Sequence, residues 1–410
     1  MNPKTAPPQR SGRWLTSGVL GIGIASLFSD LSHEMATAVL PLFLATHVGA
    51  SAAALGVIEG VADGLASYCK LLGGWWTDRA GHRKPVAIAG YVGTAVATSS
   101  LALAGHWLTV LVCRSLAWAA RGVRSPARSA LLSDIVARES YGRAFGFERA
   151  MDSLGAVLAP LLVLWMVGAG VAYQQILWLT LLPGLAAAAA IAFLVREYPR
   201  PPRPDRRLLG DLRSLPRGAV LFILIAGVFG LGQFAPTLLV LRAAEALREP
   251  AGVLGASRAA LGLYVLFNVM QTASSYVIGM LSHRLGSVFS LGLGYGLFAV
   301  ATAGFAWVGS DAAALATLFG LAGVAVGIIE AMESTVAAEL LPADRRGTGF
   351  GALGAANGIG DFLSSVMVGA LWAGFGPGVG FGVAALFNVA SLVLLAWAWP
   401  VLKSAGLQSK

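Results

Sequence analysis

The chain has 410 residues, of which 57% are hydrophobic and 12% are Asp, Glu, Lys or Arg, and its formal net charge is +9. A water-soluble domain is usually about 45–50% apolar and about 25% charged. The chain therefore has too little polar surface for a soluble globule, and its composition indicates a protein that is solvated by a lipid bilayer.

Apolar segments of helix length follow one another along the chain. About twenty apolar residues span a bilayer as a helix, because the hydrocarbon core is roughly 30 Å thick and each residue adds about 1.5 Å. The first six segments cover residues 15–45, 52–74, 86–105, 107–133, 144–169 and 173–195. Six more cover residues 218–242, 256–281, 288–308, 312–337, 348–373 and 378–400. We therefore expect an all-α membrane protein with twelve transmembrane helices.

The segment at residues 196–217 is basic and rich in proline, so it cannot span a membrane. We expect it to form an extended, solvated linker between two six-helix bundles, residues 1–195 and 218–410. Most of the 29 Lys and Arg residues fall on the same side of the expected helices as this linker. The positive-inside rule then predicts that the linker and both termini are cytoplasmic. Because the basic residues border membrane spans and form no single basic face, we expect no nucleic-acid partner.

A pattern of residues recurs after 205 positions. The segment GWWTDRAG at residues 74–81 returns as GMLSHRLG at residues 279–286. The same offset aligns GRAFGFERAMDSLG at residues 142–155 with GTGFGALGAANGIG at residues 347–360. One constant offset that joins separated segments indicates that the two halves are structural repeats.

The two six-helix repeats, with a G-x-x-x-D-R-x-G-x-R-K loop between the second and third helices, resemble the major facilitator superfamily of transporters. The loop motif is carried by Gly74, Asp78, Arg79, Gly81 and Arg83. Gly155 and Pro160 match part of a fifth-helix motif of the proton-linked drug exporters in that superfamily. The resemblance implies the major facilitator fold with two pseudo-symmetric bundles, which rock about a central site. We expect a monomer without a cofactor, in a bacterial-type inner membrane.

The charged loop has two interpretations. Asp78 can lie against the N-terminus of a neighbouring helix, whose partial positive charge favours an anion. The resemblance implies that this neighbour is the helix at residues 348–373, and that the contact closes the cytoplasmic gate. In the alternative interpretation the cluster only anchors the loop at the membrane surface.

Ionisable residues inside the expected spans must face one another or a wet cavity, because a charge in mid-bilayer costs roughly 2.5–3.5 kcal/mol. Four arginines on one face of the helix at residues 107–133 are Arg114, Arg121, Arg124 and Arg128. On the next helix, Glu148 and Asp152 are expected partners of Arg124 and Arg128, in an ion-pair network that holds or gates the bundle. Arg121 is expected near mid-membrane, where it contacts the substrate or couples transport to protons.

The first helix carries Asp30, His33 and Glu34 near its middle. Burial raises the pKa of a carboxyl group and a nearby arginine lowers it, so a carboxyl between these influences can bind and release protons. The alternative is a fixed ion pair between Asp30 and Arg121. Metal binding would need more ligands than these three residues, and we expect no metal site.

The second half has its own polar candidates. Glu330 and Glu333 occupy the positions that the repeat matches to Ser125 and Arg128, so the two halves differ in charge there. These acids could pair the two halves or face the substrate. Further candidates for the substrate or proton path are Gln233, Asn357 and Asp361, each of which a neighbouring helix could instead satisfy.

The sequence predicts proton-coupled antiport that exports a small organic molecule or drug. The energy source is expected to be the proton gradient, because no P-loop occurs in the chain. Proton-coupled uptake of an organic anion is the first alternative, and divalent metal export is the second. A receptor would need a signalling domain, and an intramembrane enzyme would need a catalytic constellation; we find neither in the sequence.

Overall fold

The computed structural model describes residues 14–44, 48, 52–198 and 207–408. In these residues all regular structure is helical. The helices of the first half are α1 (Ser17–Phe43), α2 (Ala52–Ala80), α3 (Lys84–Ser99), η2 (Ser100–Leu103), α4 (Trp107–Ile135), η3 (Arg138–Ser140), α5 (Tyr141–Gly168), α6 (Tyr173–Leu179) and α7 (Leu181–Leu194). Those that follow are α8 (Leu208–Arg213), α9 (Arg217–Gly230), α10 (Pro236–Ala246), α11 (Arg248–Leu285), α12 (Ser287–Trp307), α13 (Ala312–Leu340), α14 (Arg346–Phe375) and α15 (Pro377–Gln408).

Each predicted apolar segment lies on one or two of these helices. Six stretches among the described residues are long and apolar enough to cross a membrane: Lys84–Leu103, Arg138–Gly168, Tyr173–Leu194, Ser287–Trp307, Ala312–Leu340 and Pro377–Leu402. The helices α1, α2, α4, α11 and α14 are longer than most of these stretches, but they are less apolar or carry more charged residues. The count of twelve spans therefore stays a prediction.

Two predictions on the connections were wrong in part. The segment at residues 218–242 is not one helix, because α9 ends at Gly230 and α10 begins at Pro236. Proline lacks the backbone N–H that would continue α9, but it is well suited to begin a new helix. The linker is not extended throughout, since residues 208–213 form α8. Its leucine-rich sequence LLGDLR contains no proline, whereas most of the linker's prolines lie outside the described residues.

The chain divides into two compact units. The first unit comprises residues 1–144, 151–215 and 341–355, and the second comprises residues 145–150, 216–340 and 356–410. The helices α5 and α14 thus each contribute residues to both units. The predicted bundle boundaries, at residues 195 and 218, stay a prediction.

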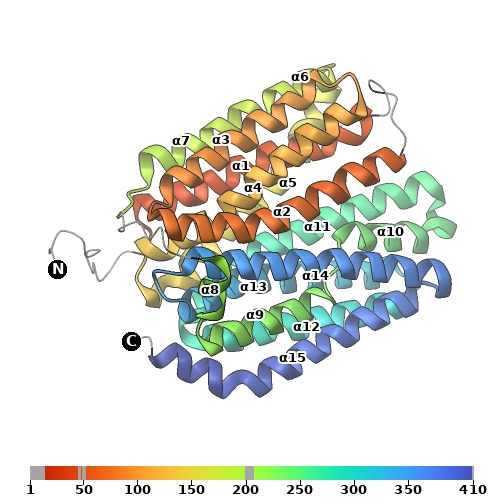
Figure 1. Cartoon of the computed structure of the whole chain (residues 1–410). Coiled ribbons are helices and arrows are strands. Elements are labelled where there is room, and N and C mark those ends of the chain that lie inside the picture. The colour runs from red at the N-terminus through yellow and green to blue at the C-terminus, as the bar shows by residue number, and fades with distance from the viewer. Residues whose placement is uncertain (1–13, 45–47, 49–51, 199–206, 409–410) are drawn as a thin grey trace. The chain divides into compact units, whose positions relative to one another are not determined.

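Close helix packing defines the first unit. There α4 packs along α2 and α3, while α1 and α3 pack against α7 (Figure 1). Gly122 on α4 lies so near α2 that a Cβ atom there would be 2.6 Å from the Ala66 carbonyl oxygen and 2.8 Å from the Cys69 Cβ. The absence of a side chain at Gly122 therefore sets the distance between α2 and α4.

An aromatic core characterises the second unit, in which α13 packs along α11 and α12, and α15 packs along α9 and α12. The rings of Phe229 and Tyr295 are stacked with their centroids 4.1 Å apart, and Phe305 meets Phe319 edge to face at 5.3 Å. These four side chains are almost completely buried, so the core of this unit is built from large rings.

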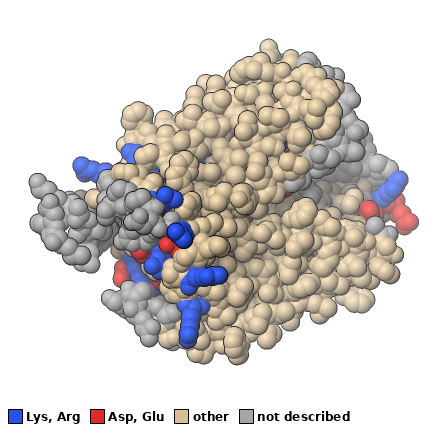
Figure 2. Space-filling view, viewed as in Figure 1, with Lys and Arg blue, Asp and Glu red and all other residues tan. Residues whose placement is uncertain are grey.

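The outer surfaces of both units are apolar. Large hydrophobic side chains that are more than half exposed include Leu164 and Phe193 of the first unit and Trp307 and Leu386 of the second. In Figure 2 the visible charged side chains gather near helix ends, and the flanks of the helices are almost free of them. Such surfaces suit contact with lipid, in agreement with a multi-pass membrane protein.

The packing of Gly122 gives a testable prediction. Gly122→Ala should lower the free energy of unfolding by about 1–3 kcal/mol, because the added methyl group presses on the α2 backbone. Gly64→Ala on α2 is the control, since nothing lies within 4 Å of its Cβ position. A thermal unfolding series in detergent measures both variants. Equal midpoints for the two would contradict the account of this contact.

Candidate functional site

The charged loop between α2 and α3 has a defined turn. Gly81 has a φ of 73°, which side-chain-bearing residues rarely adopt, and its N–H donates to the Thr77 carbonyl oxygen. The turn delivers Arg83 to the N-cap position of α3. The Glu197 carboxylate accepts hydrogen bonds from the backbone N–H groups of Arg83 and Lys84, the latter at 3.0 Å. A residue from the start of the linker therefore caps α3.

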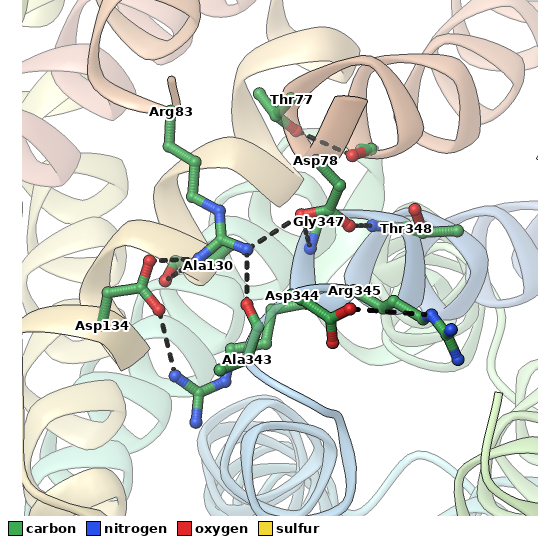
Figure 3. Close-up of polar contacts among 12 residues, drawn as sticks. Thr77, Asp78, Arg83, Ala130, Asp134, Ala343, Asp344, Arg345, Gly347 and Thr348 are labelled. Atoms are coloured by element: carbon green, nitrogen blue, oxygen red, sulfur yellow. Dashed lines mark hydrogen bonds and ion pairs between the residues drawn. The ribbon is translucent and has the colours of Figure 1, made fainter. Parts of the chain in front are cut away.

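Asp78 is buried at the N-terminus of α14. Its carboxylate accepts hydrogen bonds from the backbone N–H groups of Gly347 at 3.0 Å and Thr348 at 2.7 Å (Figure 3). It also pairs with the Arg83 guanidinium at 2.8 Å. The helices α2 and α14 come close here because Gly74 and Gly347 have no side chains. A Cβ on either residue would overlap the backbone of the other. The helix N-terminus and the guanidinium both favour a charged carboxylate here.

Asp134, which the sequence analysis did not identify, joins two arginines. It pairs with Arg83 and, at 3.1 Å, with Arg346 (Figure 3). Arg346 also donates to the Tyr141 hydroxyl. Burial alone would lower the pKa of Arg83, but Asp134 and Asp78 together raise it above its ordinary value, so this guanidinium stays charged.

The sequence alone carries no signal for the contact of Asp134 with Arg346, because the two residues are 212 positions apart. We name the group of Asp78, Arg83, Asp134 and Arg346 the α14 clamp. Arg79, which the motif also contains, lies outside it and stacks over the Trp75 ring at 5.3 Å.

A second polar cluster joins α1 to α4 within the first unit. The Arg121 guanidinium donates to the Asp30 carboxylate at 2.8 Å. Asp30 is only 6% exposed, whereas the Arg121 side chain is 21% exposed. The Trp118 ring lies 5.5 Å from the guanidinium carbons of both Arg121 and Arg114, and 4.8 Å from the His33 ring.

Two further contacts complete the cluster. His33 Nε2 lies 3.9 Å from the Glu34 carboxylate. Arg114 donates to the Thr37 hydroxyl at 3.2 Å. The residues Asp30, His33, Glu34 and Arg121 were grouped by the sequence analysis, and the structure brings them together.

Arg128 lies beside Asp152 of α5, with 3.7 Å between the charged atoms, and donates to the Ser26 hydroxyl at 2.7 Å. Gly155, one turn beyond Asp152, permits this arrangement, since a Cβ there would be 2.6 Å from the Leu27 carbonyl oxygen of α1. Pro160 lies farther along α5, which continues through it.

Arg124 lacks the carboxylate partner that we expected. Its side chain is 3% exposed, and the guanidinium lies over the Tyr91 ring of α3 at 4.1 Å. Among the described residues no carboxylate is within ion-pair distance of it, and its Nε and Nη1 atoms have no hydrogen-bond partner. The side chain lies against α3, where Gly90 packs against its Cβ and Tyr91 against its guanidinium. Glu148, its expected partner, is buried and belongs to the second unit.

The acids of α13 form a separate cluster in the second unit. Glu330 accepts a hydrogen bond from Gln271 at 2.7 Å and lies 3.5 Å from the Arg149 guanidinium. Glu333 accepts hydrogen bonds from Tyr295 at 2.8 Å and from Asn357 at 2.6 Å.

Two further candidates of the second unit are Gln233 and Asp361. Gln233 is in the break between α9 and α10, where its N–H donates to the Phe229 carbonyl oxygen, and Asp361 is half-buried one turn beyond Asn357 on α14. Among the residues that the structure describes, no three His, Cys, Asp or Glu side chains are grouped as metal ligands.

Comparison with known proteins agrees with this architecture. The family model of the Major Facilitator Superfamily (MFS) matches residues 22–247 and 239–409. An uncharacterised MFS-type transporter of Methanocaldococcus jannaschii is 28% identical over 340 residues, which cover 82% of this chain and 83% of that protein. An uncharacterised protein of Mycobacterium tuberculosis is 32% identical over 198 residues, 48% of this chain and 47% of that protein.

A solved structure shows the same fold. The crystal structure of the human organic anion transporter MFSD10 (TETRAN) aligns with a TM-score of 0.75, covering 92% of this chain and 99% of that chain. The sequence identity is 17%, so the likeness concerns the fold.

The α14 clamp gives a prediction. Asp78→Asn keeps the shape of the side chain but removes the charge that Arg83 and the helix N-terminus require, so α14 should detach more often. In a chain with Cys69 and Cys113 replaced by alanine, a cysteine at the buried position Thr348 should then react faster with maleimide. The control is Asp344→Asn, on a partly exposed acid just before α14. Equal labelling rates in both variants would argue against the clamp.

The arginines of α4 give a second prediction, in which two similar variants have opposite effects. Arg124→Met should leave the free energy of unfolding unchanged or raise it, because it removes a buried charge that has no carboxylate partner. Arg128→Met should lower it by about 3–5 kcal/mol, because it deprives the buried Asp152 of its ion pair. Denaturant unfolding in detergent compares the two, and a larger loss in Arg124→Met would show the assignment to be wrong.

Proposed function

Because the chain belongs to the Major Facilitator Superfamily, we propose that it is a proton-coupled secondary transporter that moves a small organic anion by alternating access. The family and the transporter of similar fold indicate a transporter and not an enzyme. The proton gradient supplies the energy, and no cofactor takes part.

The observation that carries the proposal is the ion pair of Asp30 and Arg121, one turn of α4 from Arg124, which has no ion-pair partner among the described residues. A buried ion pair is favourable only while both groups are charged, so a proton that reaches Asp30 releases Arg121. The released guanidinium then binds an anionic group such as a carboxylate or a sulfonate. The proton and the anion bind together, which makes symport the expected mode of coupling.

The acids of α13 favour a second candidate, proton-driven export of a cationic drug. A cationic group that binds at Glu330 or Glu333 displaces a proton from it, so the coupling in this case is antiport. The two candidates differ in the sign of the proton movement that accompanies the substrate, and an experiment can distinguish them.

The α14 clamp is proposed as the gate. It holds the first turns of α14 to α2 and α4 within the first unit, while the rest of α14 belongs to the second unit. A movement of the second unit that draws α14 away must break the contacts of Asp78 and Asp134. By the positive-inside rule this end of the molecule is cytoplasmic, as are both termini, and the membrane is the bacterial-type inner membrane.

Proteoliposomes with a trapped pH-sensitive dye test the coupling. A carboxylate or sulfonate that is carried by symport should acidify the interior when it is added outside, whereas a cationic drug carried by antiport should make the interior alkaline. Asp30→Asn should abolish the response while exchange of the labelled anion across the membrane continues, because asparagine cannot release a proton.

The control for this experiment is Asp311→Asn, on an exposed acid that precedes α13, and it should behave as the wild type. A full dye response in Asp30→Asn, or no response of the wild type to any carboxylate, sulfonate or cationic drug in the panel, would refute proton coupling at this pair.

A further inference from the structure

Glu333 is a buried acid of the second unit that contacts two neighbouring helices. It lies on α13 and is 5% exposed. The Tyr295 hydroxyl of α12 donates to one of its oxygens at 2.8 Å, and the Asn357 side-chain amide of α14 donates to the other at 2.6 Å. Both donors are electrically neutral, so hydrogen bonds and not an opposite charge hold this carboxyl group.

The charges nearby leave Glu333 without a counter-ion. Arg149 lies 3.5 Å from Glu330, one turn earlier on α13, and Gln271 of α11 donates to the same oxygen of Glu330. The charged groups nearest to Glu333 along the chain and in the cluster are Glu330, one turn earlier on α13, and Arg149, which pairs with Glu330, while Asp361 follows one turn after Asn357 on α14. No cation lies within ion-pair distance of Glu333 among the described residues.

The repeat explains how this situation arises. The 205-residue offset matches Glu333 with Arg128, and Asn357 with Asp152. In the first unit these two positions form an ion pair at 3.7 Å, and in the second unit they form a hydrogen bond at 2.6 Å. The same pair of helix positions is thus electrically balanced in the first unit and carries a single ionisable acid in the second.

Asn357 can serve both protonation states of the acid. Its amide N–H group donates to the ionised carboxylate, and its Oδ1 atom has no hydrogen-bond partner. If the amide turns over, Oδ1 accepts the O–H of the protonated acid. A carboxyl group without a counter-ion in an apolar protein interior is less costly when it is neutral, and the site offers an acceptor for the proton that makes it so.

We propose that Glu333, held by Tyr295 and Asn357, is a second proton-binding site of the transporter, which is loaded independently of Asp30. The proposal rests on the proposed function only for the use of the proton, because the binding itself needs no substrate. A proton bound at Glu333 forms the O–H bond of the acid, and its loss returns the carboxylate that the two donors stabilise.

Infrared spectroscopy of the purified full-length protein tests the binding without a substrate. A pH titration of the Asp30→Asn variant, in which the acid of the proposed function cannot bind a proton, should show the C=O band of a protonated carboxyl group that disappears as the pH rises. Adding Glu333→Gln should remove this band, while adding Glu330→Gln should retain it. Tyr295→Phe should move the band to higher frequency, because the carbonyl oxygen loses a hydrogen bond.

The outcome separates this proposal from the proposed function. A band that persists unchanged when Glu333→Gln is added to Asp30→Asn, or the absence of any titrating band in Asp30→Asn, would overturn the second site whatever the transport assays give. Loss of the band in Glu333→Gln supports it even where the dye assay finds no proton movement. Gln keeps the size and an acceptor oxygen, and Tyr295→Phe gives an independent readout should Glu333→Gln fail to fold.

Discussion

The cost of a charge in hydrocarbon governs the arrangement of this protein. A charged group at mid-bilayer costs roughly 2.5–3.5 kcal/mol even on an insertion scale. Ionisable side chains such as Asp30, Arg124 and Glu333 are accordingly buried, while the exposed flanks carry residues such as Leu164 and Trp307. Several of these acids and bases form ion pairs, as Asp30 does with Arg121, whereas Arg124 and Glu333 have no ion-pair partner among the described residues. The pair of Asp30 with Arg121 and the unpaired Glu333 carry the functional proposals.

The compensation works because helices come very close together. Glycines at helix crossings permit this close approach, and such a crossing occurs in both repeats. Gly74 of α2 contacts Gly347 and Gly351 of α14 in the first unit, and Gly279 of α11 contacts Gly146 of α5 in the second, at positions 205 residues apart. Only the first crossing carries a buried aspartate, since His283 occupies the position that matches Asp78. The two crossings thus share a close glycine contact and differ in charge. We therefore expect the loss of a charge to weaken the first crossing, at Asp78, more than the second.

Much of the helical architecture could be predicted from the sequence, because runs of apolar residues and breaks in them depend on neighbouring residues alone. The resemblance to the family's loop motif predicted that Asp78 contacts the start of α14. The ion pair of Asp30 with Arg121 was one of two interpretations of the first helix, the other being a carboxyl group that binds and releases protons. The break before Pro236 was missed because hydropathy alone does not register the backbone restrictions of a proline.

The partners of other side chains could not be deduced from one sequence. The contact of Arg124 with Tyr91 depends on the rotation of α4 relative to α3, which helical spacing within α4 does not determine. Asp134 and Arg346 are 212 residues apart and meet only because α14 begins beside the end of α4. Nor could the hydrogen bonds of Glu333 be foreseen, because the donors come from two other helices, α12 and α14.

A double-mutant cycle on Asp30 and Arg121 tests most directly whether inward-facing charges stabilise one another. Asp30→Asn, Arg121→Gln and the double variant would be unfolded in detergent, and their free energies of unfolding compared with that of the wild type. The account predicts that the double variant loses less than the sum of the two single losses, by about 0.5–3 kcal/mol. Strictly additive losses would show that the two charges do not depend on each other, and would contradict it.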